Sequence, residues 1–137
     1  MGILDRFSLA GRKALVTGAG QGIGQAYALA LAEAGADVAV VDINSATAAQ
    51  VAAEVRALGK QALAITTDVT QSAAVRDMVA QVVNAWGRLD IGVNNAGIGR
   101  WANAEEMSEA DWDAVLDLNL KAVFLCCQAE GRVMLAQ

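Results

Sequence analysis

The chain has 137 residues, of which 55% are apolar and 18% are charged, and its formal net charge is −5. This composition predicts one globular domain with an ordinary core and excludes a disordered chain. The acidic balance, without any basic run, makes nucleic acid and anionic membranes poor partners. Asp5 and Arg6 lie in the first ten residues, and Glu33, Gly35 and Asp37 interrupt the most apolar stretch, so neither a secretory leader nor a membrane span is predicted.

Short apolar runs alternate with longer amphipathic runs along the chain. Strands are predicted at residues 13–17, 37–41, 61–66 and 89–93, and helices at 22–33, 45–58, 72–86 and from Ser108 onward. Gly59 and Gly87 are placed to end the second and third helices. This alternation predicts an α/β fold, a parallel sheet covered by helices on both faces with right-handed crossovers. One domain spans residues 1–137, with no internal boundary.

Polar residues mark the predicted starts of the last two helices. Ser72 or Thr70 is expected to cap the third helix, and Ser108 with Asp111 forms a partial capping box at the fourth. From Asp111 to Gln137 the helical pattern continues without a stop signal. We therefore expect the domain to be truncated within its last helix.

The two cysteines, Cys126 and Cys127, are neighbours in an apolar stretch. Adjacent side chains on a helix point about 100° apart, which does not suit a disulfide between them. They are interpreted as small core residues in a reducing, cytoplasmic setting, and no metal site is predicted.

A glycine-rich turn follows the first predicted strand, in the sequence Thr17-Gly-Ala-Gly-Gln-Gly-Ile-Gly24. It fits the spacing T-G-x-x-x-G-x-G and departs from G-x-G-x-x-G, because Ile23 takes the place of the third glycine. Glycines let the backbone approach a ligand, and the helix that follows offers free N–H groups, so a pyrophosphate site is predicted. A tight strand-to-helix connection is the simpler alternative. A P-loop is disfavoured because Gln25 and Ala26 replace the Lys-Ser/Thr pair.

Asp42 closes the second predicted strand, 18 positions after Gly24. An acid about 20 residues beyond the glycines is suited to the adenosine ribose hydroxyls of a dinucleotide. No arginine or lysine occurs at Ile43, Asn44 or the middle of the glycine turn to hold a 2′-phosphate, so NAD is favoured over NADP. The alternative is that Asp42 only caps the next helix.

Three further motifs follow in order. Asp68-Val69 comes after the third strand, Asn94-Asn95-Ala96-Gly97 after the fourth, and Asn119 lies in the last helix. With the glycine turn and Asp42, they make the chain resemble the N-terminal part of a short-chain dehydrogenase/reductase. The resemblance implies a Rossmann-type doubly wound sheet with strand order 3-2-1-4, here incomplete, and a nicotinamide dinucleotide as cofactor.

The resemblance also implies roles along the dinucleotide. The glycine turn would hold the pyrophosphate, Asp42 and the Ile43 backbone the ribose, Asp68 and Val69 the adenine, and the segment from Asn95 the ribose next to the nicotinamide. The residues expected to bind the cofactor are Gly18, Gln21, Gly22, Ile23, Gly24, Asp42, Ile43, Asp68, Val69, Asn95, Ala96 and Gly97. The alternatives are an acidic turn residue for Asp68 and turn-forming asparagines.

Asn119 is the one member of the family's Asn-Ser-Tyr-Lys catalytic set that this sequence contains. The resemblance implies that it distorts its helix and that its backbone carbonyl holds a water of the proton relay; an ordinary buried polar residue is the alternative. The one tyrosine, Tyr27, lies in the first predicted helix without a lysine four residues on, and no serine follows Asn119. A chain with only these residues is not expected to turn over by the family mechanism.

The leading hypothesis is an NAD-dependent oxidoreductase acting on a secondary alcohol or ketone of sugar, polyol or 3-oxoacyl type. The alternative is a non-catalytic dinucleotide-binding or oligomerisation module, and a methyl-donor transferase is a third reading. Arg100 and Trp101 are placed either at the substrate mouth or in a surface loop. The strand at 89–93 is expected to be an exposed apolar edge, and the apolar last helix resembles the family's interface helix, so a homo-oligomer is expected.

Overall fold

The computed structural model describes residues 2–137 and forms one parallel sheet in the order β3-β2-β1-β4. The strands are β1 (Lys13–Thr17), β2 (Asp37–Asp42), β3 (Ala62–Thr66) and β4 (Ile91–Asn94). Leu15 of β1 pairs with Ala39 of β2 and with Gly92 of β4, so β1 lies in the middle of the sheet. The predicted doubly wound order 3-2-1-4 is confirmed.

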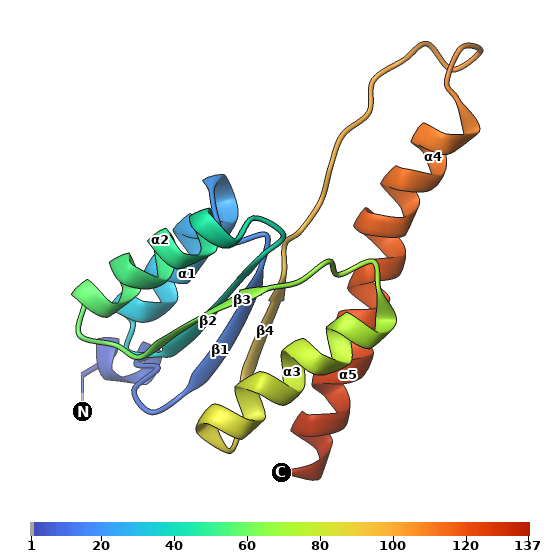
Figure 1. The fold of residues 1–137 in the computed structure, drawn as a ribbon. Helices are drawn as coiled ribbons and strands as arrows, with labels where there is room; N and C mark the ends of the chain where they lie inside the picture. Colours follow the sequence, from blue (N-terminus) through green and yellow to red (C-terminus); the bar gives the residue numbers. More distant parts are fainter. Residues whose placement is uncertain (1) are drawn as a thin grey trace.

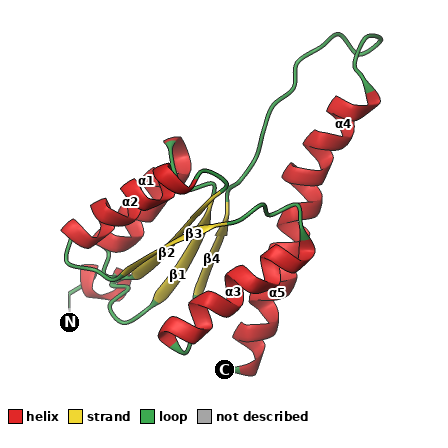
Figure 2. Cartoon of the chain, in the orientation of Figure 1, coloured by secondary structure: helices red, strands yellow, loops and turns green. Residues whose placement is uncertain are grey.

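Helices cover both faces of this sheet (Figure 1). Helices α1 (Gly22–Glu33) and α2 (Ser45–Ala57) cover one face, and α3 (Ser72–Trp86) and α5 (Ala122–Ala136) cover the other (Figure 2). Alternate residues of β1 point to opposite cores, since Ala14 and Val16 belong to the first and Leu15 to the second. This explains why the strands are apolar at nearly every position.

Strand β2 ends one residue later than predicted, α2 ends one residue earlier, and β3 begins one residue later. The start of α3 is a more informative difference. Gln71 is its N-cap and makes no side-chain cap bond, so neither Ser72 nor Thr70 caps this helix as expected. The Thr70 hydroxyl donates instead to Asp68 Oδ1, at 2.7 Å, which holds it in the preceding turn. Gly87 ends α3 with φ of 74°, as predicted.

Strand β4 begins at Ile91, two residues later than predicted. Leu89 is fully buried, and its backbone N–H and C=O are bound by the Gln137 side chain. The Asp90 carboxylate accepts from the Arg88 guanidinium and from the Lys13 N–H, and these bonds lower the Asp90 pKa to about 2. The expected edge position of β4 is confirmed, but its first two predicted residues are not an exposed apolar edge.

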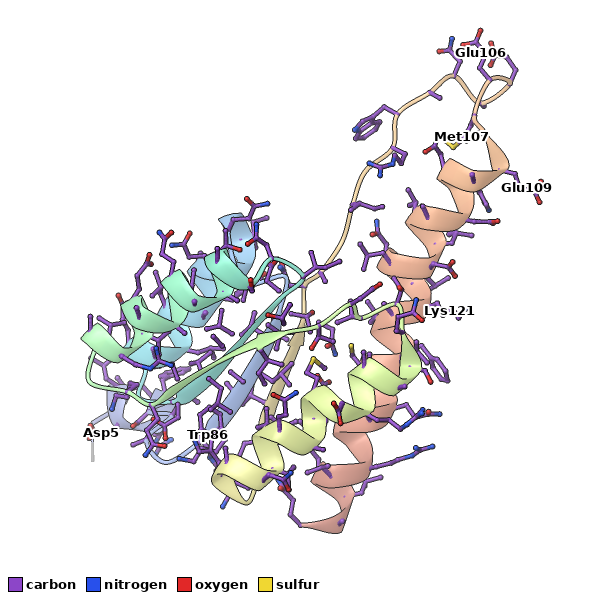
Figure 3. All side chains as sticks on the ribbon, in the orientation of Figure 1. Asp5, Trp86, Glu106, Met107, Glu109 and Lys121 are labelled. Atoms are coloured by element: carbon purple, nitrogen blue, oxygen red, sulfur yellow. The ribbon has the colours of Figure 1, made fainter. Side chains whose placement is uncertain are left out.

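The last helical region is continuous but changes its winding. Helix α4 (Glu109–Leu116) leads into the π-helix η2 (Asp117–Lys121) and then α5. Ser108 caps α4 by accepting from the Asp111 N–H at 3.1 Å, as predicted. A long loop from β4 reaches the start of α4, with Glu106 and Met107 at its far tip (Figure 3). Within residues 2–137, no helix combines the length and apolarity needed to cross a bilayer.

Candidate functional site

A cavity of about 790 Å³ lies where the chain leaves the carboxyl ends of the strands. Every residue predicted to bind the dinucleotide lines it, from Gly18 after β1 to Gly97 after β4. In parallel sheets a ligand crevice is expected outside the carboxyl ends, where the strand order reverses, here between β1 and β4. The sequence motifs are therefore gathered in one place by the topology.

The glycine turn brings α1 against the end of β1. Gly18 has φ of 62°, and a Cβ on it would lie 2.8 Å from the Ala96 Cα. A Cβ on Gly24 would overlap the Gly18 carbonyl and lie 2.6 Å from Asn95 Nδ2. Gln21, the N-cap of α1, makes no side-chain bond to the first turn. The first N–H groups of α1 therefore border the cavity without a side-chain cap, which suits an anionic pyrophosphate.

The Asp42 carboxylate lies beside the glycine turn. Its Oδ2 accepts from the Gly20 N–H at 2.9 Å, and its Oδ1 from the Asn44 N–H at 3.0 Å. Asn44, rather than Asp42, caps α2, because the Asn44 side chain accepts from Ala46 and Thr47. The capping alternative for Asp42 is therefore wrong. In the described part of the chain, no lysine or arginine lines this cavity.

Asp68 and Val69 line the cavity beyond β3. Asp68 Oδ1 accepts from both the N–H and the hydroxyl of Thr70, so one carboxylate oxygen is engaged in the local turn. Val69 is 5% exposed and belongs to the core as well as to the cavity wall. The N–H of Thr67 donates to the Asp42 carbonyl and so links the end of β3 to the end of β2.

The two asparagines at the end of β4 have different partners. Asn95 Nδ2 donates to the carbonyls of Thr17 and Gly18, each at 3.2 Å, and ties the end of β4 to the glycine turn. The Asn94 amide donates in the opposite direction, to Glu130 of α5 at 2.9 Å. Asn95 thus borders the large cavity and also acts as a sheet-end hydrogen bonder, whereas Asn94 serves the packing of α5.

Asn119 lies in the π-helix, so the helix distortion that the resemblance implied is present. Its side chain does not line the large cavity, although its neighbours Asp117 and Leu118 do. Asn119 Oδ1 accepts from the Ile98 N–H and Asn119 Nδ2 donates to the Ile98 carbonyl, both at 2.8 Å. The amide therefore pairs with the backbone as a neighbouring strand would, and it fixes the chain just beyond Gly97.

Replacing Asn119 with alanine is expected to free the backbone at Ile98 and to lower the free energy of unfolding by about 1 kcal/mol. Hydrogen exchange of the Ile98 amide should accelerate, because its acceptor is removed. The matched control is Asn103→Ala, which removes an exposed amide contact to Glu106 in the same loop. Unchanged protection of the Ile98 amide in the Asn119 variant would contradict this role.

Several cavity residues were not found from the sequence. They are Val41, Thr67, Thr70, Ile98, Ala114, Asp117 and Leu118. Thr67 and Thr70 flank the Asp68 motif and were within reach of sequence reasoning, but nothing local marks the residues from α4 and η2. Arg100 and Trp101 do not line the cavity: Arg100 is paired with Asp111, and Trp101 is 96% exposed.

The model of the short chain dehydrogenase family matches residues 12–137 of this chain. The chain is 42% identical over 135 residues to 2-dehydro-3-deoxy-D-gluconate 5-dehydrogenase of Escherichia coli K12, which covers 98% of this chain and 53% of that enzyme. The chain thus spans about half the length of the curated relatives it matches.

Solved structures match this chain with similar sequence identity. A short-chain type dehydrogenase/reductase from Mycobacterium marinum is 44% identical with a TM-score of 0.97, over all of this chain and 56% of that one. A short chain dehydrogenase from Burkholderia cenocepacia, solved in complex with NADP, is 46% identical with a TM-score of 0.87, over 91% of this chain and 51% of that one. The strand order, the cavity and these similarities agree. The chain therefore belongs to the short chain dehydrogenase family.

Proposed function

We propose that this chain is the dinucleotide-binding part of an NAD-dependent oxidoreductase that interconverts a secondary alcohol and a ketone. The observation that carries the proposal is one cavity that joins the start of α1, without a side-chain cap, to the Asp42 carboxylate. Relatives of this chain include, by name, a sugar-acid dehydrogenase, a polyol dehydrogenase and a 3-oxoacyl reductase. A substrate of sugar, polyol or 3-oxoacyl type is proposed on that ground.

The lining residues fit the parts of a dinucleotide. Asp42 uses one lone-pair site on each oxygen for a backbone N–H, which leaves both oxygens able to accept from neighbouring ribose hydroxyls. Ile23 and Ile43 line the cavity with 69% and 70% of their surface exposed, and a bound adenosine would cover such side chains. Asp68 and Val69 would border the adenine, and Asn95 to Gly97 the ribose next to the nicotinamide.

A bound nicotinamide dinucleotide would supply the hydride acceptor or donor. The residues of this chain bind and orient: α1 attracts the pyrophosphate, Asp42 selects the ribose, and Asn119 holds the loop at Ile98. We propose that the backbone carbonyl of Asn119, in the π-helix η2, holds a water of the proton relay. Tyr27 lies on α1 and does not line the cavity, so it does not serve as the proton donor.

Replacing Asp42 with alanine is expected to lower the ratio of NAD affinity to NADP affinity about tenfold, because the hydroxyl acceptor and the charge that repels a 2′-phosphate are both lost. Titration calorimetry with each dinucleotide measures the two dissociation constants. Asp77→Ala, at an exposed position of α3, is the matched control. A protein that binds NADP more tightly than NAD before any substitution would refute the NAD assignment.

A non-catalytic binding or oligomerisation module is the second candidate. Four large apolar side chains, spaced four residues apart along the last helices, are exposed; they are Trp112, Leu116, Leu120 and Phe124. We infer that this stripe packs against a second copy in a homo-oligomer, since large exposed apolar patches mark interaction sites.

The thiols are consistent with a cytoplasmic protein, which we also propose. Within residues 2–137 neither cysteine is in a disulfide. Cys126 is buried as predicted, and burial raises its pKa to about 12, so its thiol is an inert core residue. Cys127 is exposed, so the prediction that it is a core residue is wrong.

A further inference from the structure

Gly20 lies in the glycine turn but does not line the cavity. Its φ is not in the left-handed region, so its backbone conformation is open to any residue. A glycine is therefore needed at this position because there is no room for a side chain. A Cβ on Gly20 would overlap Thr47 Oγ1 and would lie 2.8 Å from Asp42 Oδ2 and 2.9 Å from Asp42 Cγ.

We propose that the absence of a side chain at Gly20 is a determinant of cofactor specificity, because it lets the Asp42 carboxylate lie against the glycine turn in the position that selects NAD. This inference rests on the proposed function. Gly20 acts through Asp42 and is a positioning residue, since it lies outside the cavity that would hold the dinucleotide.

The carboxylate has little freedom to yield to a new methyl group. Its two oxygens are held by the N–H groups of Gly20 and Asn44, and rotation of the side chain would break both bonds. Thr47 closes the other side, and its hydroxyl donates to the Asn44 carbonyl at 3.1 Å. A Cβ at Gly20 must displace the carboxylate, the Thr47 hydroxyl, or both. Displacing the carboxylate removes the acceptor from the ribose hydroxyls and weakens its repulsion of a 2′-phosphate.

The test is a double-mutant cycle with Gly20→Ala and Asp42→Ala, in which titration calorimetry gives the dissociation constants of NAD and NADP. Gly20→Ala is expected to lower the NAD-to-NADP affinity ratio about tenfold. In the Asp42→Ala background, Gly20→Ala is expected to leave the ratio unchanged, because the carboxylate through which it acts is gone. Gly131→Ala is the matched control, since a Cβ at Gly131 meets nothing within 4 Å.

A Thr47→Ala background keeps the test decisive if Gly20→Ala alone does not fold, because it removes the hydroxyl that lies nearest to the new methyl group. In that background, a lower NAD-to-NADP affinity ratio after Gly20→Ala supports the inference, and an unchanged ratio overturns it. In the Asp42→Ala background, a further fall in the ratio overturns the inference, since Gly20 would then act apart from Asp42. A wild-type protein that favours NAD, with the same ratio after Gly20→Ala, overturns this inference alone. A wild-type protein that binds neither dinucleotide overturns the proposed function and this inference with it.

Discussion

Replacing Gly24 with alanine is expected to lower the free energy of unfolding by about 3 kcal/mol and to abolish dinucleotide binding. The new methyl group would overlap the Gly18 carbonyl and lie 2.6 Å from Asn95 Nδ2. Neither group can retreat easily, because Asn95 is tied to the carbonyls of Thr17 and Gly18. Helix α1 cannot shift outward without loss, because Ala28 is fully buried against the sheet.

Urea unfolding measures the stability loss, and calorimetry with NAD measures the binding loss. Gly22→Ala is the informative control, because a Cβ there meets nothing within 4 Å while φ is 58°. Only the strain of a left-handed backbone is added, which costs about 1 kcal/mol. If the Gly24 variant lost no more stability than the Gly22 variant, close packing of α1 on the turn would not be the reason for Gly24.

Replacing Glu130 with glutamine is expected to raise the free energy of unfolding at pH 8 by about 2 kcal/mol. Glu130 is 4% exposed, its Oε2 accepts from Asn94, and its Oε1 has no hydrogen-bond partner within residues 2–137. Burial raises the pKa of this carboxyl above its ordinary value. An amide keeps the acceptor for Asn94 and carries no charge to desolvate.

The pH dependence follows from the direction of the shift. A carboxyl whose pKa is raised on folding binds its proton more tightly in the folded state, so its contribution to stability is complete below its ordinary value of 4.5 and is lost as the pH rises through the folded pKa. The stability gain of Glu130→Gln should therefore be small at pH 4 and larger at pH 8. Unfolding curves at both pH values measure it, with the exposed Glu105→Gln as control. An equal gain at pH 4 and at pH 8 would show that Glu130 does not change its charge between these pH values, which would contradict the prediction.

The sequence determined the elements whose signals are local. The alternation of apolar strands and amphipathic helices predicted the parallel sheet, the family resemblance implied its strand order, and α1 and α3 begin and end where their periodicity and flanking glycines place them. The glycine turn and Asp42 were identified because their spacing is typical of a dinucleotide site, in which a strand end is followed by the start of a helix. The start of β4 was missed because Asp90 and Leu89 are held by Lys13, Arg88 and Gln137, two of which lie far away along the chain.

The tertiary structure decided what depends on distant contacts. Two adjacent asparagines look alike in sequence, yet Asn95 binds the glycine turn and Asn94 binds Glu130, because successive residues at a strand end point in opposite directions. The need for glycine at position 20 arises from the approach of Asp42, 22 residues away along the chain. The sequence alone thus predicted twelve of the residues that line the cavity. Only the fold decided which partner each one faces, because that depends on packing between segments that no local pattern relates.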